Sequence, residues 1–308
     1  MTSGNFSWES SAFRAGILYR VEEFLCFLRD GPLHIRQTRN HFSEWCGISM
    51  QTVLRVAEGA GWILRDQAGE YRLSPTGVAL ACQSAPTLAL REMVMQLTFA
   101  LKPSWMRLAM RGRAAVLNYA PAEVIQCLSE SGLAEAIDPT TVAWWDRFSG
   151  VERGDEDQKR LEEGRRGERL SYEYECLRTG FEPRWVALEN SAAGYDLLSV
   201  VSRTDRTPMV IEVKTTMQAW STGRFWLTCN EWSILSRADH AKLHLWGVAA
   251  EDLLFSSVAP SLLLAHIPVN QGAGQWETLS VGFANTAIEP TAVSRMTDLI
   301  VAEGTQCS

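Results

Sequence analysis

The stretch PMVIEVKTT, residues 208–216, places two charged side chains in what otherwise has the composition of a buried β-strand. Successive side chains of a strand point to opposite faces, so Glu212 and Lys214 share one face and Val213 points to the other. Burying charge is costly unless the charged groups are paired or coordinate an ion. The stretch therefore indicates a site on a sheet as well as a core strand.

A second strand is predicted over YDLLSVVS, residues 195–202, and the polar turn RTDRT joins it to the first. The two strands should form an antiparallel hairpin, which brings Asp196 roughly level with Glu212 to Lys214. Two carboxylates about 4 Å apart repel by roughly 4 kcal/mol at an effective dielectric near 20, and Lys214 offsets only part of this repulsion. A divalent cation such as Mg²⁺, which binds through one or two carboxylates, suits the pair.

Further elements on either side of the hairpin complete a pattern of helix, three strands, helix, strand. GERLSYEYECLRTG, residues 167–180, predicts a helix, from which Glu168, or alternatively Glu173 or Glu175, could supply a third carboxylate. FWLT, residues 225–228, is the predicted third strand, and KLHLWGVA, residues 242–249, the fourth.

The residues between these last two strands predict local structure and no chemistry. Thr228 and Glu231 have the spacing of a capping box at the start of a helix, so Asn230 and Glu231 are interpreted as helix-start residues. His240 and His244 are interpreted as surface residues, because a change from helix to strand between them spoils metal-ligand geometry.

Asp196 followed sixteen positions later by Glu212 resembles the PD-(D/E)XK nuclease signature. Within that superfamily the segment from about 164 to 250 is similar to the domain named after the C-terminus of the plant NO VEIN protein, which is widespread in bacterial restriction and defence loci. The stretch V-I-E-V-K-T-T is similar also to archaeal Holliday-junction resolvases. The motifs that carry the resemblance are R-x-G-E at 165–168, G-Y-D-hydrophobic-x-S at 194–199, I-E-V-K at 211–214 and F-x-L-T-x-N-E-W at 225–232.

The resemblance implies a restriction-endonuclease-like αβββαβ core that hydrolyses DNA phosphodiester bonds with Mg²⁺ or Mn²⁺. It implies that Asp196 and Glu212 are catalytic metal ligands, that Lys214 is the catalytic lysine, and that Glu168 is a helix carboxylate that assists metal binding. It also implies a homodimer, because cutting both strands usually requires two such sites.

Two departures and one alternative stand beside this interpretation. Tyr195 replaces the proline of the superfamily motif, which is ordinary for the NO VEIN type, and Thr215 stands where glycine is more common. Without the resemblance, Glu212 and Lys214 could form a salt bridge on an edge strand, which is a common device against aggregation.

Residues 1–85 predict a winged helix-turn-helix domain. AGILYRVEEFLCFLRD, residues 15–30, has the apolar spacing of one buried helical face, and residues 34–66 predict a helix, a turn at Cys46-Gly47 and a second helix capped by Ser49. EYRLSPTG, residues 70–77, supplies strand material for a wing.

The second helix of this domain is the candidate for DNA recognition. GISMQTVLRVAEGAGWI, residues 47–63, resembles the recognition half of bacterial helix-turn-helix regulators. Met50, Gln51 and Arg55 point outward from the predicted helix and would reach bases or phosphates. Dimerisation or partner docking is the alternative use of such a domain.

The rest of the chain is divided into two further domains, so the fold class is multidomain α+β or α/β. Residues 86–150 predict a helical connector in which Trp105, Trp144 and Trp145 serve packing. The charge run at 152–169 predicts a solvated helix or hinge that opens a nuclease-like domain over 151–308.

Composition limits the classes of protein and partner. Seven cysteines without a C-x-x-C pair argue against a disulfide framework and a structural zinc site. No apolar run approaches the roughly 20 residues of a membrane span, so a cytoplasmic protein without membrane contact is expected. A formal net charge of -7 does not favour nucleic acid, although a local basic patch can coexist with it.

The expected function is that of a metal-dependent DNA endonuclease in restriction or anti-phage defence, with an ATPase, a helicase or another defence protein as a possible partner. One alternative is a DNA-binding regulator or assembly scaffold whose nuclease-like domain is inert. A protein-interaction module is a third possibility, which the sequence pI of about 5.4 favours.

Overall fold

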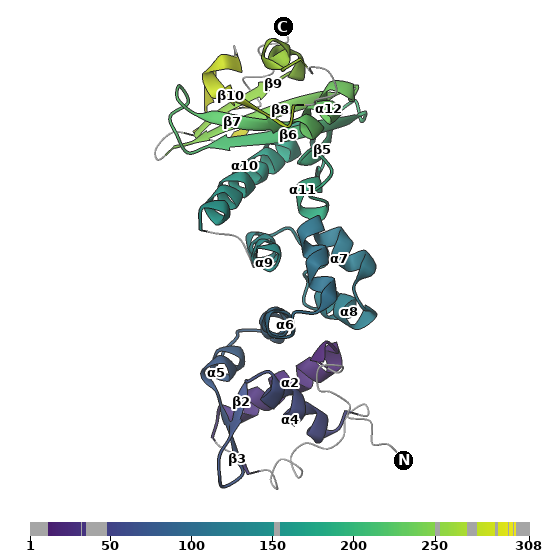
Figure 1. The fold of residues 1–308 in the computed structure, drawn as a ribbon, viewed down its shortest axis with the longest axis vertical. Coiled ribbons are helices and arrows are strands. Elements are labelled where there is room, and N and C mark those ends of the chain that lie inside the picture. The colour runs from purple at the N-terminus through teal and green to yellow at the C-terminus, as the bar shows by residue number, and fades with distance from the viewer. Residues whose placement is uncertain are drawn as a thin grey trace. The chain divides into compact units, whose positions relative to one another are not determined.

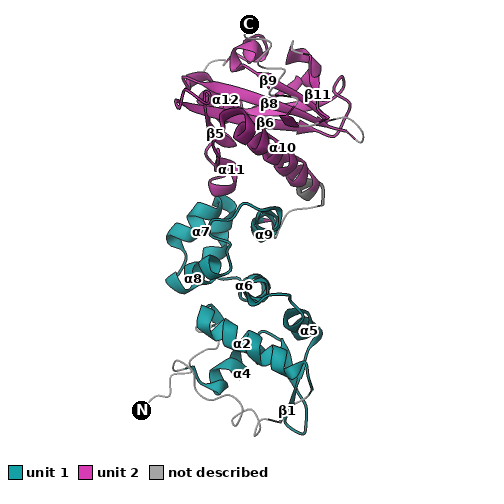
Figure 2. Ribbon diagram, turned by 180° about the vertical axis from the view of Figure 1, so that it is seen from behind, with its two compact units in different colours: residues 1–149 teal, residues 150–308 magenta. Residues whose placement is uncertain are grey.

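A computed structural model describes residues 12–31, 33–34, 48–150, 155–249, 253–269, 276–286, 289–294, 296–297 and 299. The chain divides into two compact units, Met1–Ser149 and Gly150–Ser308 (Figure 2). Within these ranges, no helix combines the length and the apolar character that crossing a membrane requires.

In the described residues of the first part of unit 1, three helices accompany a three-stranded antiparallel sheet in the order β1-β3-β2. The apolar face predicted for α2 is confirmed, since Ile17, Leu18, Val21, Phe24, Leu25 and Leu28 are all buried. Ser49 caps α4 as predicted, because its side chain accepts from the Thr52 N–H at 3.3 Å. The elements are α2 (Ala15–Leu28), β1 (Leu33–His34), α4 (Met50–Gly59), β2 (Ile63–Arg65), β3 (Glu70–Leu73) and α5 (Pro75–Ala81).

The helix and the Cys46-Gly47 turn predicted between residues 34 and 48 lie outside the described residues. The winged-helix assignment of residues 1–85 therefore stays a prediction.

The second part of unit 1 is helical and contains an aromatic core. Trp144 stacks on Phe148 with ring centroids 4.8 Å apart, and Trp105 stacks on the same ring at 5.9 Å. Trp105, Trp144 and Trp145 are all buried, so their predicted packing role is confirmed. The elements are α6 (Pro86–Leu101), the 3-10 helix η1 (Ser104–Arg111), α7 (Arg113–Tyr119), α8 (Ala122–Glu130) and α9 (Pro139–Ser149).

Unit 2 is built on a six-stranded sheet in the order β11-β9-β8-β6-β5-β4. From residue 155 on, the charge run and the helix predicted after it form one helix, α10 (Asp155–Thr179). The remaining elements are β4 (Arg184–Trp185), α11 (Val186–Glu189), β5 (Leu197–Val200), β6 (Pro208–Thr216), β7 (Arg224–Thr228), α12 (Cys229–Arg237), β8 (Ala241–Val248), β9 (Leu253–Val258), η2 (Pro260–His266), β10 (Thr278–Gly282), η3 (Phe283–Thr286) and β11 (Thr291–Ala292).

The predicted hairpin is confirmed, because β5 pairs antiparallel with β6, with Leu197 opposite Ile211. Helix α12 then returns the chain so that β8 pairs parallel with β6. The consecutive antiparallel strands that precede this crossover in the sheet are β4, β5 and β6.

FWLT forms a strand, β7, but its predicted place as the third strand of the sheet is wrong. It pairs antiparallel with β10 in a separate two-stranded sheet. The edges of β6 are taken by β5 and β8, so β7 instead lies over the sheet, where Phe225 and Leu227 join a buried cluster with Leu243 and Leu245 of β8.

Helix α10 contacts β5, β6 and β8 on the opposite face of the sheet (Figure 1). The indole N–H of Trp246 on β8 donates to the Ser171 hydroxyl of α10 at 2.7 Å. The pairing of Thr215 with Trp246 places Thr215 on the α10 face, and the pairing of Lys214 with Leu245 places Lys214 on the β7 face.

Close contact between α10 and β6 depends on a glycine. A Cβ atom on Gly167 would lie 1.9 Å from the Thr215 hydroxyl oxygen and 3.3 Å from a Val213 methyl group. Gly167 therefore lets the helix approach the strand that carries Glu212 and Lys214.

We expect Gly167→Ala to destabilise the protein by about 1–3 kcal/mol, because the added methyl group overpacks the contact between α10 and β6. Gly164→Ala is the matched control. Its Cβ would meet only a Glu168 carboxylate oxygen at 3.9 Å, and alanine is favoured over glycine in a helix by up to about 1 kcal/mol. Urea denaturation measures both changes, and equal stability of the two variants would contradict the role given to Gly167.

Candidate active site

Asp196 lies directly before β5 and is hydrogen-bonded to β6 on either side of Glu212. Its backbone N–H donates to the Ile211 carbonyl oxygen at 3.0 Å, and the β5–β6 register places the next residue, Leu197, opposite Ile211. The Asp196 carboxylate accepts from the Val213 N–H at 2.7 Å, and it lies close enough to Glu212 to influence its ionisation. Asp196 is therefore roughly level with Glu212 on β6.

Glu212 and Lys214 form an ion pair inside the sheet. The Lys214 Nζ lies 2.7 Å from a Glu212 carboxylate oxygen, and the two side chains are only 3% and 14% exposed. The salt bridge of the alternative interpretation is present, but β6 is not an edge strand of the sheet, because it pairs with β8 from Val210 to Thr216 and with β5 as far as Ile211.

Glu231 also belongs to this cluster, which the sequence analysis missed. One carboxylate oxygen accepts from the Thr228 N–H at 2.6 Å and completes the predicted capping box of α12. The other oxygen accepts from Lys214 Nζ at 3.1 Å. Its place in the F-x-L-T-x-N-E-W motif was the signal that could have identified it.

Glu168 is buried on α10 and lies close enough to Asp196 to influence its ionisation. Its carboxylate accepts from Arg165 at 2.6 Å and from the Trp185 indole N–H. The R-x-G-E motif thus supplies a carboxylate, its cationic partner and the glycine that seats the helix on β6.

The two alternative helix carboxylates have other environments. Glu173 is exposed, and Glu175 forms a bidentate pair with Arg178 at 2.8 and 2.6 Å. Glu175 also accepts from the Ser199 hydroxyl. Arg178 also donates to the carbonyl oxygen of Val200 in β5 and to that of Val201 just after it, so this second cluster fastens α10 to the sheet.

His244 belongs beside Glu175, so its interpretation as a surface residue is wrong. It is 1% exposed, and burial lowers its pKa to about 3, with Arg178 and Lys242 adding to the effect. A neutral imidazole is the result, packed edge-on against Tyr174 and Phe255.

Burial and mutual repulsion disturb both central carboxylates. Burial, together with the charge of Glu168, raises the pKa of Asp196 to about 7. Burial and the charge of Asp196 raise the pKa of Glu212 well above its ordinary value. Both acids are therefore poorly stabilised as anions by the groups around them.

Lys214 and Glu231 shift in the opposite sense. Burial alone would lower the pKa of Lys214, but the charges of Glu212, Glu231 and Asp196 outweigh it and raise that pKa. Burial alone would raise the pKa of Glu231, but Lys214 and the Thr228 N–H outweigh it and lower that pKa. Lys214 is thus a permanent cation at neutral pH.

The residues of this cluster lie in a segment that matches a known protein family. Residues 167–244 match the family model described as Protein NO VEIN, C-terminal. The match confirms the NO VEIN-type domain predicted for this segment, and it contains Glu168, Asp196, Glu212, Lys214 and Glu231. No curated protein and no solved structure matches the chain.

The donor set of the NO VEIN-type segment suits an ion that keeps much of its water. In the part of the chain that the structure describes, no three His, Cys, Asp or Glu side chains form a group that could hold a metal ion. Asp196 and Glu212 provide two hard oxygen donors with raised pKa values, which a nearby divalent cation would relieve. Mg²⁺ commonly binds through one or two carboxylates and several waters, so the pair fits it.

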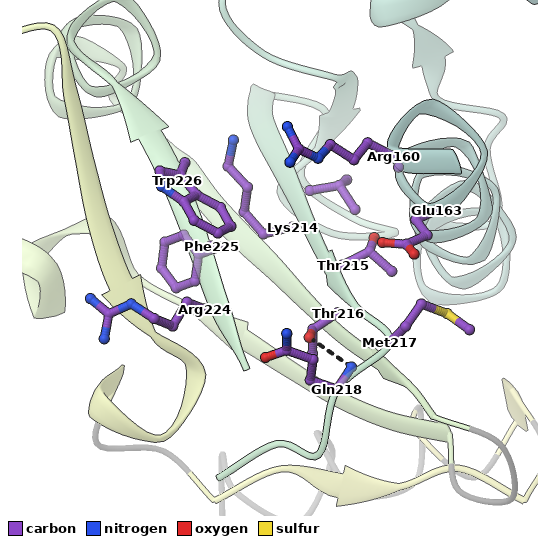
Figure 3. A pocket seen from close by; sticks show the side chains of 12 residues that line it. Arg160, Glu163, Lys214, Thr215, Thr216, Met217, Gln218, Arg224, Phe225 and Trp226 are labelled. Atoms are coloured by element: carbon purple, nitrogen blue, oxygen red, sulfur yellow. Dashed lines mark hydrogen bonds between the residues drawn. The ribbon is translucent and has the colours of Figure 1, made fainter. Parts of the chain in front are cut away.

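A pocket of about 990 Å³ opens beside Lys214 (Figure 3). Its walls come from the first half of α10, the end of β6 and the start of β7. Since β5 pairs with β6 only as far as Ile211, the later residues of β6 are accessible on that side. The pocket gives a ligand access to Lys214.

The predicted DNA-reading residues belong to unit 1. Gln51 and Arg55 are exposed on α4, and Met50 is half-buried.

We expect Asp196→Asn to stabilise the metal-free protein above neutral pH. The folded pKa of about 7 lies above the unfolded value of about 3.9, so the contribution of Asp196 to stability is full below pH ~4 and is lost as the pH rises through 7. At about pH 8 the variant should be more stable by on the order of 1 kcal/mol, which shifts the melting temperature by roughly 2–4 °C.

Thermal unfolding with EDTA or with Mg²⁺ measures this effect. Mg²⁺ should stabilise the wild type more at about pH 8 than at about pH 6, because the ion neutralises the Asp196 anion. It should not stabilise Asp196→Asn, which has no anion at this position. Glu173→Gln, which neutralises an exposed acid of α10, is the control. An equal Mg²⁺ shift in Asp196→Asn and the wild type would exclude Asp196 as a ligand.

Proposed function

We propose that unit 2 is a metal-dependent DNA endonuclease of the PD-(D/E)XK type, which hydrolyses phosphodiester bonds in restriction or anti-phage defence. The observation that carries the proposal is the burial of Asp196 and Glu212 close together at one hairpin, next to the cation of Lys214 and a pocket. The match to the NO VEIN C-terminal family supports it.

Asp196 and Glu212 would hold Mg²⁺ or Mn²⁺. When bound, such an ion neutralises charge that develops on the phosphate and makes water a better nucleophile. Glu168 lies close to Asp196, so its own carboxylate would add negative charge near the bound ion.

Lys214 would act as a cation and not as a base. Its raised pKa keeps the ammonium protonated, so it cannot take a proton from water at neutral pH. A fixed ammonium can instead stabilise the charge that develops on the phosphate in the transition state. The carboxylates of Glu212 and Glu231 hold it in place for this role.

Unit 1 would serve this reaction by binding DNA or a partner. The exposed Gln51 and Arg55 of α4 suit contacts to bases and phosphates, and the winged-helix prediction supports that use. We further propose a cytoplasmic homodimer that acts with an ATPase, a helicase or another defence protein.

A second candidate function is a DNA-binding scaffold with an inert nuclease-like domain. The observation that favours it is the double ion pair of Lys214, whose ammonium already neutralises charge on Glu212 and Glu231. Calorimetric titration of Mg²⁺ into the wild type and Glu212→Ala separates the two candidates, because an inert domain shows no difference between them.

Asp196→Ala, Glu212→Ala and Lys214→Ala should each reduce DNA cleavage by at least about 100-fold, because each removes a ligand or the stabilising cation. The assay compares circular, linear and branched DNA with and without Mg²⁺, and circular dichroism checks that each variant is folded. Glu173→Ala, an exposed acid on α10, is the matched control and should cut normally. Undiminished cleavage by the three purified variants would remove the basis of the proposal.

A further inference from the structure

The pocket beside Lys214 carries one exposed aromatic residue. Among the tryptophans that the structure describes, only Trp226 is exposed, and 60% of its surface is accessible. Its neighbours in β7, Phe225 and Leu227, are buried in the hydrophobic core, so they anchor the strand without a contribution from Trp226. Stability of β7 therefore does not explain a tryptophan at this position.

Trp226 shares the pocket with cationic side chains. Trp226, Arg160 and Lys214 all line the pocket, and Figure 3 shows Trp226 and Arg160 entering from opposite sides with Lys214 between them. Arg160 is exposed on α10, and Glu163 is the one acidic residue among those that line this pocket. An aromatic ring beside guanidinium and ammonium groups is the combination with which proteins bind a base and its phosphate.

The occupant must present an uncovered ring face. In a duplex each base is covered by its stacked neighbours, whereas an unpaired base can be splayed out and stacked on an aromatic side chain. Arg160 and Arg224 outnumber Glu163 among the charged side chains that line the pocket besides Lys214, which favours a polyanion over an apolar protein segment.

We propose that this pocket binds an unpaired nucleobase of the DNA substrate, stacked on Trp226, while Arg160 contacts the backbone phosphate. The substrate class is thereby single-stranded or locally opened DNA. This inference rests on the proposed function, because it places the strand that is cut beside Lys214.

Binding without cleavage tests the inference. Fluorescence anisotropy of the full-length protein in EDTA compares a labelled single strand with the same strand in a duplex. Trp226→Ala should weaken single-strand binding by roughly tenfold and leave duplex binding unchanged, because base–aromatic stacking is lost. Trp226→Phe keeps a ring and should retain most of the affinity.

Two further variants sharpen the result. Arg160→Ala should weaken single-strand binding and reduce its salt slope by about one, as loss of one phosphate contact requires. Tyr119→Ala removes an exposed aromatic residue of unit 1 that is 72% accessible, and Arg237→Ala removes an exposed arginine of α12 outside the pocket lining. Both controls should bind as the wild type does.

The outcomes separate this inference from the proposed nuclease. Single-strand affinity that Trp226→Ala leaves intact, or its complete absence in the wild type, overturns the stacking site even if Mg²⁺-dependent cleavage is observed. Trp226-dependent binding in a wild type that cuts no DNA supports the stacking site and rejects the nuclease.

Discussion

The organisation of unit 2 depends on keeping the Lys214 ammonium buried among carboxylates. The cation links two elements, because it contacts Glu212 on β6 and Glu231 at the start of α12. Glu231 at the same time satisfies a backbone N–H that the first turn of the helix leaves open. One charge therefore fixes the start of α12, the crossover that leads to β8 and the orientation of the candidate site.

The opposite face of β6 depends on α10, which two contacts fix in place. Gly167 allows the helix to meet Thr215 closely, and two to three turns further along, Glu175 and Arg178 fasten it to Ser199 and to the Val200 carbonyl group of β5. A helix fixed at both places has little freedom to rotate, so Glu168 is held close to Asp196. The same motifs thus supply both the site and the packing that aligns it.

Local patterns predicted part of this arrangement and non-local pairing decided the rest. The hairpin and the level of Asp196 follow from a polar turn and a two-residue period, which are local. The place of β7 depends on which edges of β6 are free, and no window of sequence contains that information. Glu168 and Glu175 are seven residues apart, which is nearly two helical turns, so periodicity puts them on one stripe and only their partners separate them.

Glu231 shows a different limit of such reasoning. Its capping spacing gave the residue a sufficient local explanation, so its place in the F-x-L-T-x-N-E-W motif was not used to predict that its second oxygen binds Lys214. The winged-helix prediction has a third limit, since its central helix and turn lie outside the described residues and only the flanking elements can be compared.

The loss of stability that the two buried carboxylates cause and the affinity for a divalent cation that they would provide have the same physical origin. Asp196 and Glu212 resist ionisation because burial and their neighbours disfavour a second negative charge, and this repulsion lowers the stability of the metal-free fold above neutral pH. A divalent cation would remove that repulsion, so the free energy lost on folding reappears as affinity for the ion. Near neutral pH, binding must also release a proton from Asp196, because only the anion can serve as a ligand. A site built from ligands with ordinary pKa values would fold more stably and would hold the ion less strongly.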